Sequence, residues 1–136
     1  MKNRTLHRTI GRPLDRPLST FNIGKALVDL KTEEAFTREG RNAIILHKED
    51  GLKVVLMAMR EGNCIQSHKA QTPITVHLLE GSVQFNTEKE SLRLGRGDLL
   101  TLRAGVAHDV KALEDSAFIL TLAGTALSAD RLGIGR

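Results

Sequence analysis

The chain has 136 residues, 40% of them hydrophobic and 26% charged, which is typical of one globular domain and too short for a second core. No apolar run is long enough to cross a membrane, and the polar, basic N-terminus is unlike a secretory signal. The single cysteine, Cys64, excludes an internal disulfide and a cysteine-rich zinc motif, so we expect a cytoplasmic protein.

The net charge of +4 is concentrated at the N-terminus. Residues 1–25 hold six of the 20 basic side chains but one of the 16 acidic ones. Pro13 and Pro17 interrupt helix and sheet pairing, so residues 1–24 are predicted to form a basic, extended, irregular arm. Such an arm can bind nucleic acid electrostatically, but no DNA-binding motif follows it. We therefore favour a solvated terminus over an arm that binds nucleic acid.

Residues 22–39 allow two interpretations. The spacing of Ala26, Leu27 and Leu30 fits a short helix or an edge strand, and we favour a helix over residues 32–36. After Gly40, short apolar runs alternate with turn residues as far as residue 122. The predicted strands are 43–46, 53–59, 65–68, 74–79, 83–86, 91–94, 99–102, 108–112 and 117–122.

Many short, closely spaced strands are typical of a sandwich or a closed barrel. We expect residues 25–122 to form this single domain, followed by a frayed tail over residues 123–136. The strand over residues 53–59 is apolar on both faces. Such a strand is covered on both sides, in a packed sandwich or at a subunit contact.

Two patterns of glycine and histidine occur in the second half. The first, over residues 62–81, runs through Gly62, His68, Ala70, Ile74 and Gly81; the second, over residues 97–112, runs through Gly97, Gly105, His108 and Ala112. Their spacing resembles the two motifs of the cupin family, G-x5-H-x-H-x(3,4)-E-x6-G and G-x5-P-x-G-x2-H-x3-N. The resemblance covers about half the chain. It implies an all-β fold, the double-stranded β-helix or jelly-roll barrel of RmlC-like cupins.

Complete cupin sites resemble a cage of three histidines and one glutamate around iron, manganese, nickel or zinc. This sequence has Ala70 where the second histidine belongs and Ile74 where the glutamate belongs. His68 and His108 are the remaining candidate ligands, fewer than the three or four that a divalent metal generally requires. We therefore expect weak metal binding or none.

Other side chains could complete the set. Side chains alternate along a strand, so His77 should point opposite to position 74 unless a bulge near Pro73 changes the alternation. Cys64 and Gln66 share the parity of His68, and Cys64 would give a Cys/His/His set. A cysteine is, however, more often a small buried hydrophobe, and we favour that interpretation here.

We expect an apolar pocket for a small organic ligand inside the barrel. Its predicted lining is Gln66, His68, Val76, Leu78, Phe85, Leu100, Arg103 and His108. Arg103, at the predicted opening, either binds an anion or is a solvated turn residue. Gly81 and Gly105 fall at chain reversals and are expected to have positive φ.

Three functions remain open. The first, which we favour, is a small-ligand-binding protein with weak or no metal binding. The second is a metal-dependent oxygenase or isomerase acting on a small acid or sugar derivative through His68 and His108. The third is a regulatory or interaction module whose basic arm contacts nucleic acid. Cupins of this size are usually dimers, so the resemblance and the doubly apolar strand over residues 53–59 predict a homodimer.

Overall fold

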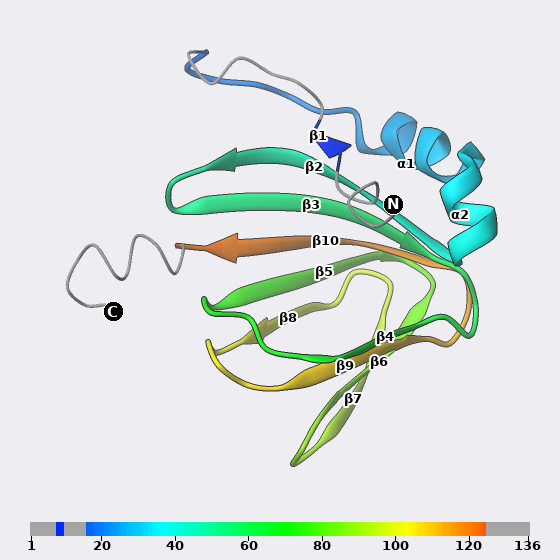
Figure 1. Ribbon diagram of the computed structural model, residues 1–136, viewed down its shortest axis with the longest axis vertical. Coiled ribbons are helices and arrows are strands. Elements are labelled where there is room, and N and C mark those ends of the chain that lie inside the picture. Colours follow the sequence, from blue (N-terminus) through cyan, green and yellow to red (C-terminus); the bar gives the residue numbers. More distant parts are fainter. Residues whose placement is uncertain (1–7, 10–15, 125–136) are drawn as a thin grey trace.

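The computed structural model describes residues 8–9 and 16–124 (Figure 1). Most of the predicted arm, at residues 1–7 and 10–15, and nearly all of the predicted tail, at 125–136, lie outside the described residues. Within the arm, β1 (Arg8–Thr9) pairs in parallel with Ile44 and Ile45 of β2 (Arg41–Glu49). The first helix begins at Ile23, so the last two residues of the predicted arm, 23 and 24, are helical.

Two helices precede the barrel, α1 (Ile23–Thr32) and α2 (Glu34–Glu39). The side chain of Asn22 caps α1 by accepting a hydrogen bond from the backbone N–H of Lys25 at 2.9 Å. Glu33 has an extended backbone and separates the helices. The helix predicted over residues 32–36 is therefore misplaced, and the edge-strand alternative for residues 26–30 is wrong. Among the described residues, no helix is long and apolar enough to cross a membrane.

Every predicted strand from residue 43 to residue 122 is present. The strands are β2 (Arg41–Glu49), β3 (Leu52–Met59), β4 (Cys64–His68), β5 (Ile74–Glu80), β6 (Ser82–Thr87), β7 (Ser91–Gly95), β8 (Leu99–Leu102), β9 (His108–Ala112) and β10 (Ser116–Ala123). They form a six-stranded sheet in the order β1-β2-β3-β10-β5-β8 and a four-stranded sheet in the order β4-β9-β6-β7. All pairs except β1–β2 are antiparallel. This arrangement confirms the predicted all-β jelly-roll fold.

The larger sheet is apolar on both faces. Its inner face and the smaller sheet enclose the main core, which includes Leu78, Val83, Phe85 and Phe118. The two helices lie beside β2 and β3 (Figure 1). On the outer face of the sheet, Leu27 and Leu30 of α1 belong to one buried cluster with Leu56 of β3. Leu30 and Leu56 are fully buried by this contact. The chain therefore covers both faces of β3 itself, and the homodimer stays a prediction without support from this strand.

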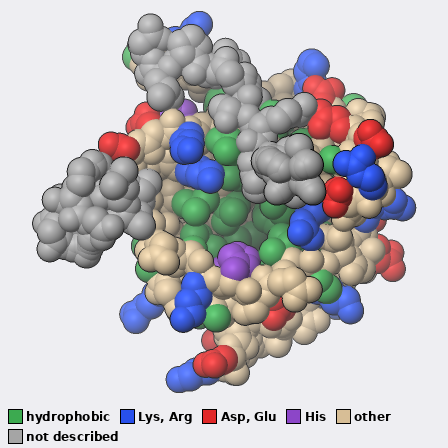
Figure 2. All heavy atoms as spheres, viewed as in Figure 1, with side chains coloured by type: hydrophobic (Ala, Val, Ile, Leu, Met, Phe, Trp, Pro, Cys, Tyr) green, Lys and Arg blue, Asp and Glu red, His purple; other side chains and the backbone are tan. Residues whose placement is uncertain are grey.

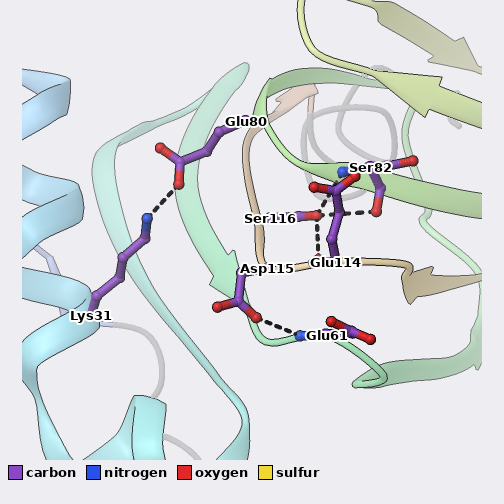
Figure 3. Close-up of polar contacts among 7 residues, drawn as sticks. All are labelled: Lys31, Glu61, Glu80, Ser82, Glu114, Asp115 and Ser116. Carbon is purple, nitrogen blue, oxygen red and sulfur yellow. Dashed lines mark hydrogen bonds and ion pairs between the residues drawn. The ribbon is translucent and has the colours of Figure 1, made fainter.

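The turn between β5 and β6 requires glycine. Gly81 has a φ of 86°, and a Cβ there would lie 2.2 Å from the Ser116 Oγ and 2.3 Å from the carbonyl oxygen of Asp115. Ser116 is buried, and its Oγ accepts a hydrogen bond from the Ser82 N–H at 3.0 Å (Figure 3). The same hydroxyl lies 2.7 Å from the Glu114 carbonyl oxygen, to which it can donate. We name Gly81, Ser82, Glu114, Asp115 and Ser116 the glycine turn.

Two further contacts in Figure 3 hold this end of the barrel together. Lys31 of α1 forms an ion pair with Glu80 at the end of β5. The carboxylate of Asp115 accepts a hydrogen bond from the backbone N–H of Glu61 at 2.8 Å, which joins the β3–β4 loop to the β9–β10 turn. These contacts attach α1 and the β3–β4 loop to the barrel near the turn between β5 and β6.

Candidate functional site

A cavity of about 590 Å³ lies between the two sheets and opens to solvent. Its buried part is apolar and aromatic, and includes Val76, Phe85 and Phe118, whereas its exposed part comes largely from residues 66–69 in and after β4. Figure 2 shows apolar side chains in this hollow, with histidine at its edge and lysine or arginine beside it. The volume falls within the range of small-molecule sites, about 300–1,000 Å³.

The four positions that the motifs assign to a metal cage converge on this cavity. His68, Ala70, Ile74 and His108 all line it. Three different strands and the β4–β5 loop supply them, so the chain brings together residues up to 40 positions apart, as the sequence predicts. Two of the four positions present imidazoles and two present aliphatic carbon.

The two imidazoles are neighbours on paired strands. His68 of β4 is the register partner of His108 of β9, and the ring centroids are 4.3 Å apart at an interplanar angle of 57°. His108 is 3% exposed and stacks on Phe85 at 5.1 Å between centroids, whereas His68 is exposed. His108 therefore belongs to the inside of the cavity and His68 to its edge.

Backbone carbonyls orient both rings in the same way. Nδ1 of His68 lies 2.8 Å from the carbonyl oxygen of Gln66, and Nδ1 of His108 lies 2.9 Å from that of Val106. A carbonyl oxygen only accepts hydrogen bonds, so each Nδ1 carries a proton. In the neutral ring Nε2 then has the free lone pair, which is available to a ligand.

Burial lowers the pKa of His108 below the ordinary histidine value of 6.5, because the charged ring loses hydration. The Val106 carbonyl raises that pKa, a protonated His68 lowers it by repulsion, and the Asp109 carboxylate raises it. The net effect leaves His108 neutral at pH 7, as a hydrogen-bonding and stacking group within the cavity.

The donor set does not fit a tightly held metal. Across residues 8–9 and 16–124, no group of three or more His, Cys, Asp or Glu side chains is arranged to hold a metal ion. Zinc sites in proteins use three or four protein ligands, and His68 and His108 supply two. Ala70 and Ile74 occupy the places where the other two would stand.

Cys64 does not complete the set, because a bulge reverses the alternation on which its prediction rested. Along β4–β9, Cys64 pairs with Lys111 and Ile65 with Val110, but His68 pairs with His108, so β4 contains one extra residue. Ile65 consequently lines the cavity, whereas Cys64 does not. Cys64 is also exposed, so the expectation of a buried small hydrophobe is wrong as well.

His77 lies on the outer side of β5, as strand alternation predicts. It is exposed, whereas Val76 and Leu78 on either side of it are buried. His77 is absent from the cavity lining, and no bulge brings it to the side of Ile74. It is not a ligand candidate in this fold.

Five of the eight residues predicted to line a ligand pocket line this cavity, namely Gln66, His68, Val76, Phe85 and His108. Leu78 and Leu100 are wrong as lining residues, because they belong to the packed core beside the cavity. Arg103 is also wrong for this cavity. It is exposed and lines a different hollow next to the turn at residues 88–90.

The lining residues outside the two motifs were not predicted from the sequence. These residues come mostly from β2, β3 and β10, and include Arg41, Ala43, Met57, Leu120 and Leu122. A strand that is apolar on both faces is buried on both sides, so its sequence does not indicate which of its apolar residues face the cavity. Arg41 carried no signal, being one arginine at the start of an apolar run.

The folded chain is similar to solved cupin structures. A cupin-2 domain-containing protein from Shewanella frigidimarina has a TM-score of 0.62 at 13% identity, over 76% of this chain and 93% of that chain. KdgF from Halomonas sp. has a TM-score of 0.59 at 23% identity, over 63% of this chain and 80% of that chain. A variant of oxalate decarboxylase from Bacillus subtilis has a TM-score of 0.59 at 22% identity, over 67% of this chain and 27% of that chain.

No protein-family model matches the sequence, and no curated protein matches it. The structural likeness shows that the chain has the cupin fold, as its two motifs predict. At least one neighbour, the decarboxylase, is an enzyme, so the fold alone does not separate binding from catalysis.

Proposed function

We propose that this chain binds a small organic molecule in the cavity between its sheets and does so without a tightly bound metal. The observation that carries the proposal is the position of Ala70 and Ile74, which line the cavity at two of the four cage positions. These aliphatic side chains stand where a complete cage has metal ligands, so this part of the cavity suits an apolar group better than a cation.

The remaining polar groups suit recognition of an organic ligand. His108 presents a neutral ring stacked on Phe85, and His68 presents a second ring at the edge. A cavity that is mostly apolar with a few fixed polar groups gains affinity from burial and orientation from the hydrogen bonds. The two Nε2 atoms supply such orienting groups.

The proposal is tested by filling the cavity. We expect Ala70→Phe to abolish the stabilisation that small organic compounds give in a thermal-shift screen, because the ring would occupy ligand space. Ala104→Phe is the matched control, since Ala104 is exposed in a turn and outside the cavity. If no compound stabilises the unaltered protein, or if both variants respond as it does, the proposal is wrong.

A second function, a metal-dependent enzyme that uses His68 and His108, has one observation in its favour: the two rings are adjacent with both Nε2 lone pairs free. Elemental analysis of protein purified without chelator separates the two functions. We expect less than about a tenth of a metal ion per chain. A stoichiometric metal that is lost in His68→Ala and His108→Ala would favour the enzyme.

The cytoplasmic location, the homodimer and a regulatory role of the basic arm stay predictions. Light scattering tests the dimer, and a single monomeric species would contradict it. Salt-dependent binding to random duplex DNA tests the arm, because counterion release makes electrostatic binding fall steeply with salt.

A further inference from the structure

We propose that the cavity selects a monocarboxylate with an apolar body and that Arg41 binds the carboxylate. This inference rests on the proposed function, since it names the class of molecule that the cavity takes. It adds one residue from β2 that neither motif contains.

The charges around the cavity have one sign. Arg41 and Lys69 line it, and none of the described lining residues is Asp or Glu. Within the described ranges, no carboxylate forms an ion pair with Arg41. An arginine next to apolar surface without an acidic partner favours an anionic ligand, because that ligand supplies the missing charge.

Hydrogen bonds hold the Arg41 guanidinium in place and leave free the edge that can bind a carboxylate. The guanidinium Nη1 donates to the Asn63 Oδ1 at 3.1 Å and to the Cys64 carbonyl oxygen at 3.0 Å, which uses both of its protons. In residues 8–9 and 16–124, no hydrogen bond occupies Nε or Nη2. These two nitrogens form the planar fork that binds a carboxylate through two parallel hydrogen bonds.

The support behind Arg41 is itself fixed. Asn63 donates from its Nδ2 to the Glu39 carbonyl oxygen at 3.2 Å. A Cβ on Gly40 would lie 2.5 Å from that Nδ2, so the glycine at the end of α2 makes room for the amide. Because the guanidinium is held before a ligand arrives, less side-chain entropy is lost on binding.

The other lining residues determine the polarity of the ligand body that the cavity accepts. Met57, Phe118, Leu120 and Leu122 come from β3 and β10 and give the cavity an apolar wall. A charge or a ring of hydroxyls placed against this wall would lose hydration without recovering hydrogen bonds there. The part of the ligand that meets this wall is therefore apolar.

Isothermal titration calorimetry of the full chain with three probes tests the inference. Octanoate carries both features, octan-1-ol lacks the charge, and acetate lacks the apolar body. We expect octanoate to bind at least about tenfold more tightly than octan-1-ol, the effect of a charge-assisted hydrogen bond. We expect acetate to bind at least about 100-fold more weakly than octanoate, because it buries far less carbon.

Matched arginine variants identify the residue. Arg41→Gln should weaken octanoate binding at least about tenfold and leave octan-1-ol unchanged. Arg103→Gln removes the same charge from an exposed position outside the cavity and should leave both affinities unchanged. Arg41→Lys keeps the charge but loses the fork, so an intermediate affinity is expected. Thermal unfolding of each variant checks that it is folded.

The outcomes separate this inference from the proposed function. Equal binding of octanoate and octan-1-ol, unaffected by Arg41→Gln, would overturn the anion selectivity while the cavity remains a binding site. An equal loss in Arg41→Gln and Arg103→Gln would also overturn it, because general charge would then explain the effect. If Ala70→Phe leaves octanoate binding intact, the ligand lies elsewhere and both proposals fail.

Discussion

The buried polar groups of the glycine turn are hydrogen-bonded within the part of the chain that the structure describes, whereas several polar groups of the cavity are not. In the glycine turn, the buried Ser116 hydroxyl accepts from one backbone group and lies within donating distance of two others. In the cavity, the fork of Arg41 and the Nε2 atoms of both histidines have no hydrogen bond from the described residues. Polar groups that are satisfied by the chain stabilise its fold, whereas those left open can recognise something else.

This contrast makes separable predictions, because changes in the glycine turn should alter stability without altering ligand selectivity. Changes at the cavity should do the reverse.

Gly81→Ala should cost at least about 3 kcal/mol of unfolding free energy, since the new Cβ meets backbone atoms as well as requiring a positive φ. Gly51→Ala is the control, because Gly51 has a φ of 91° and nothing within 4 Å of its Cβ position. The control should cost about 1–2 kcal/mol. Urea unfolding measures both, and equal losses would show that the close packing at the glycine turn is unimportant.

Restoring two donors in the cavity should create a metal site. We expect the double variant Ala70→His with Ile74→Glu to bind Zn²⁺ at least about 100-fold more tightly than the unaltered chain, a gain of about 2.7 kcal/mol. His68→Ala in the same background should remove the gain. Competition with a chromogenic chelator measures the affinity. No gain in a folded double variant would mean that these four positions do not form one cage.

Ser116→Ala should cost about 1–3 kcal/mol, because the backbone N–H of Ser82 loses its partner in a buried place. Octanoate affinity should stay the same in this variant. Chemical unfolding and calorimetry on the same preparation give the two numbers. A change in octanoate affinity as large as that in Arg41→Gln would contradict the separation of the two regions.

Strand positions were predictable from the sequence because turn residues and apolar runs mark them locally. The positions of β8 and β9 agree with the prediction to the residue. The cage positions were predictable because a motif specifies spacing, and the jelly-roll order then brings them together. The helices were harder to place, since the spacing of Leu27 and Leu30 fits both a helix and a strand. Their packing against β3 is what favours the helix.

The remaining errors have a common physical cause. The parity of Cys64 relative to His68 depends on one extra residue in β4, and a bulge leaves no mark in a short polar stretch. Arg41 becomes important through contacts with Asn63 and the carbonyl of Cys64, which lie 22 and 23 positions away. Local patterns specify elements, but long-range contacts decide which ends of those elements meet.

The smallest expected effect is a pH dependence that arises in the cavity and not at the glycine turn. The pKa of His108 is lowered in the folded chain, so the unfolded chain takes up its proton first as the pH falls. Stability from this residue should be constant above about pH 6.5 and should fall below it, until the lowered pKa is reached. The slope cannot exceed about 1.4 kcal/mol per pH unit for one group.

His108→Gln should remove this slope between about pH 5.5 and 6.5, a window that lies above the ordinary titration of carboxylates. His77→Gln is the control, because His77 is exposed on the outer face of β5 and should leave the slope unchanged. His68 is the ionisable side chain whose ring lies 4.3 Å from that of His108, so His68→Gln should reduce the slope in part. If the slope survives in His108→Gln, burial of this ring is not what makes the fold sensitive to acid.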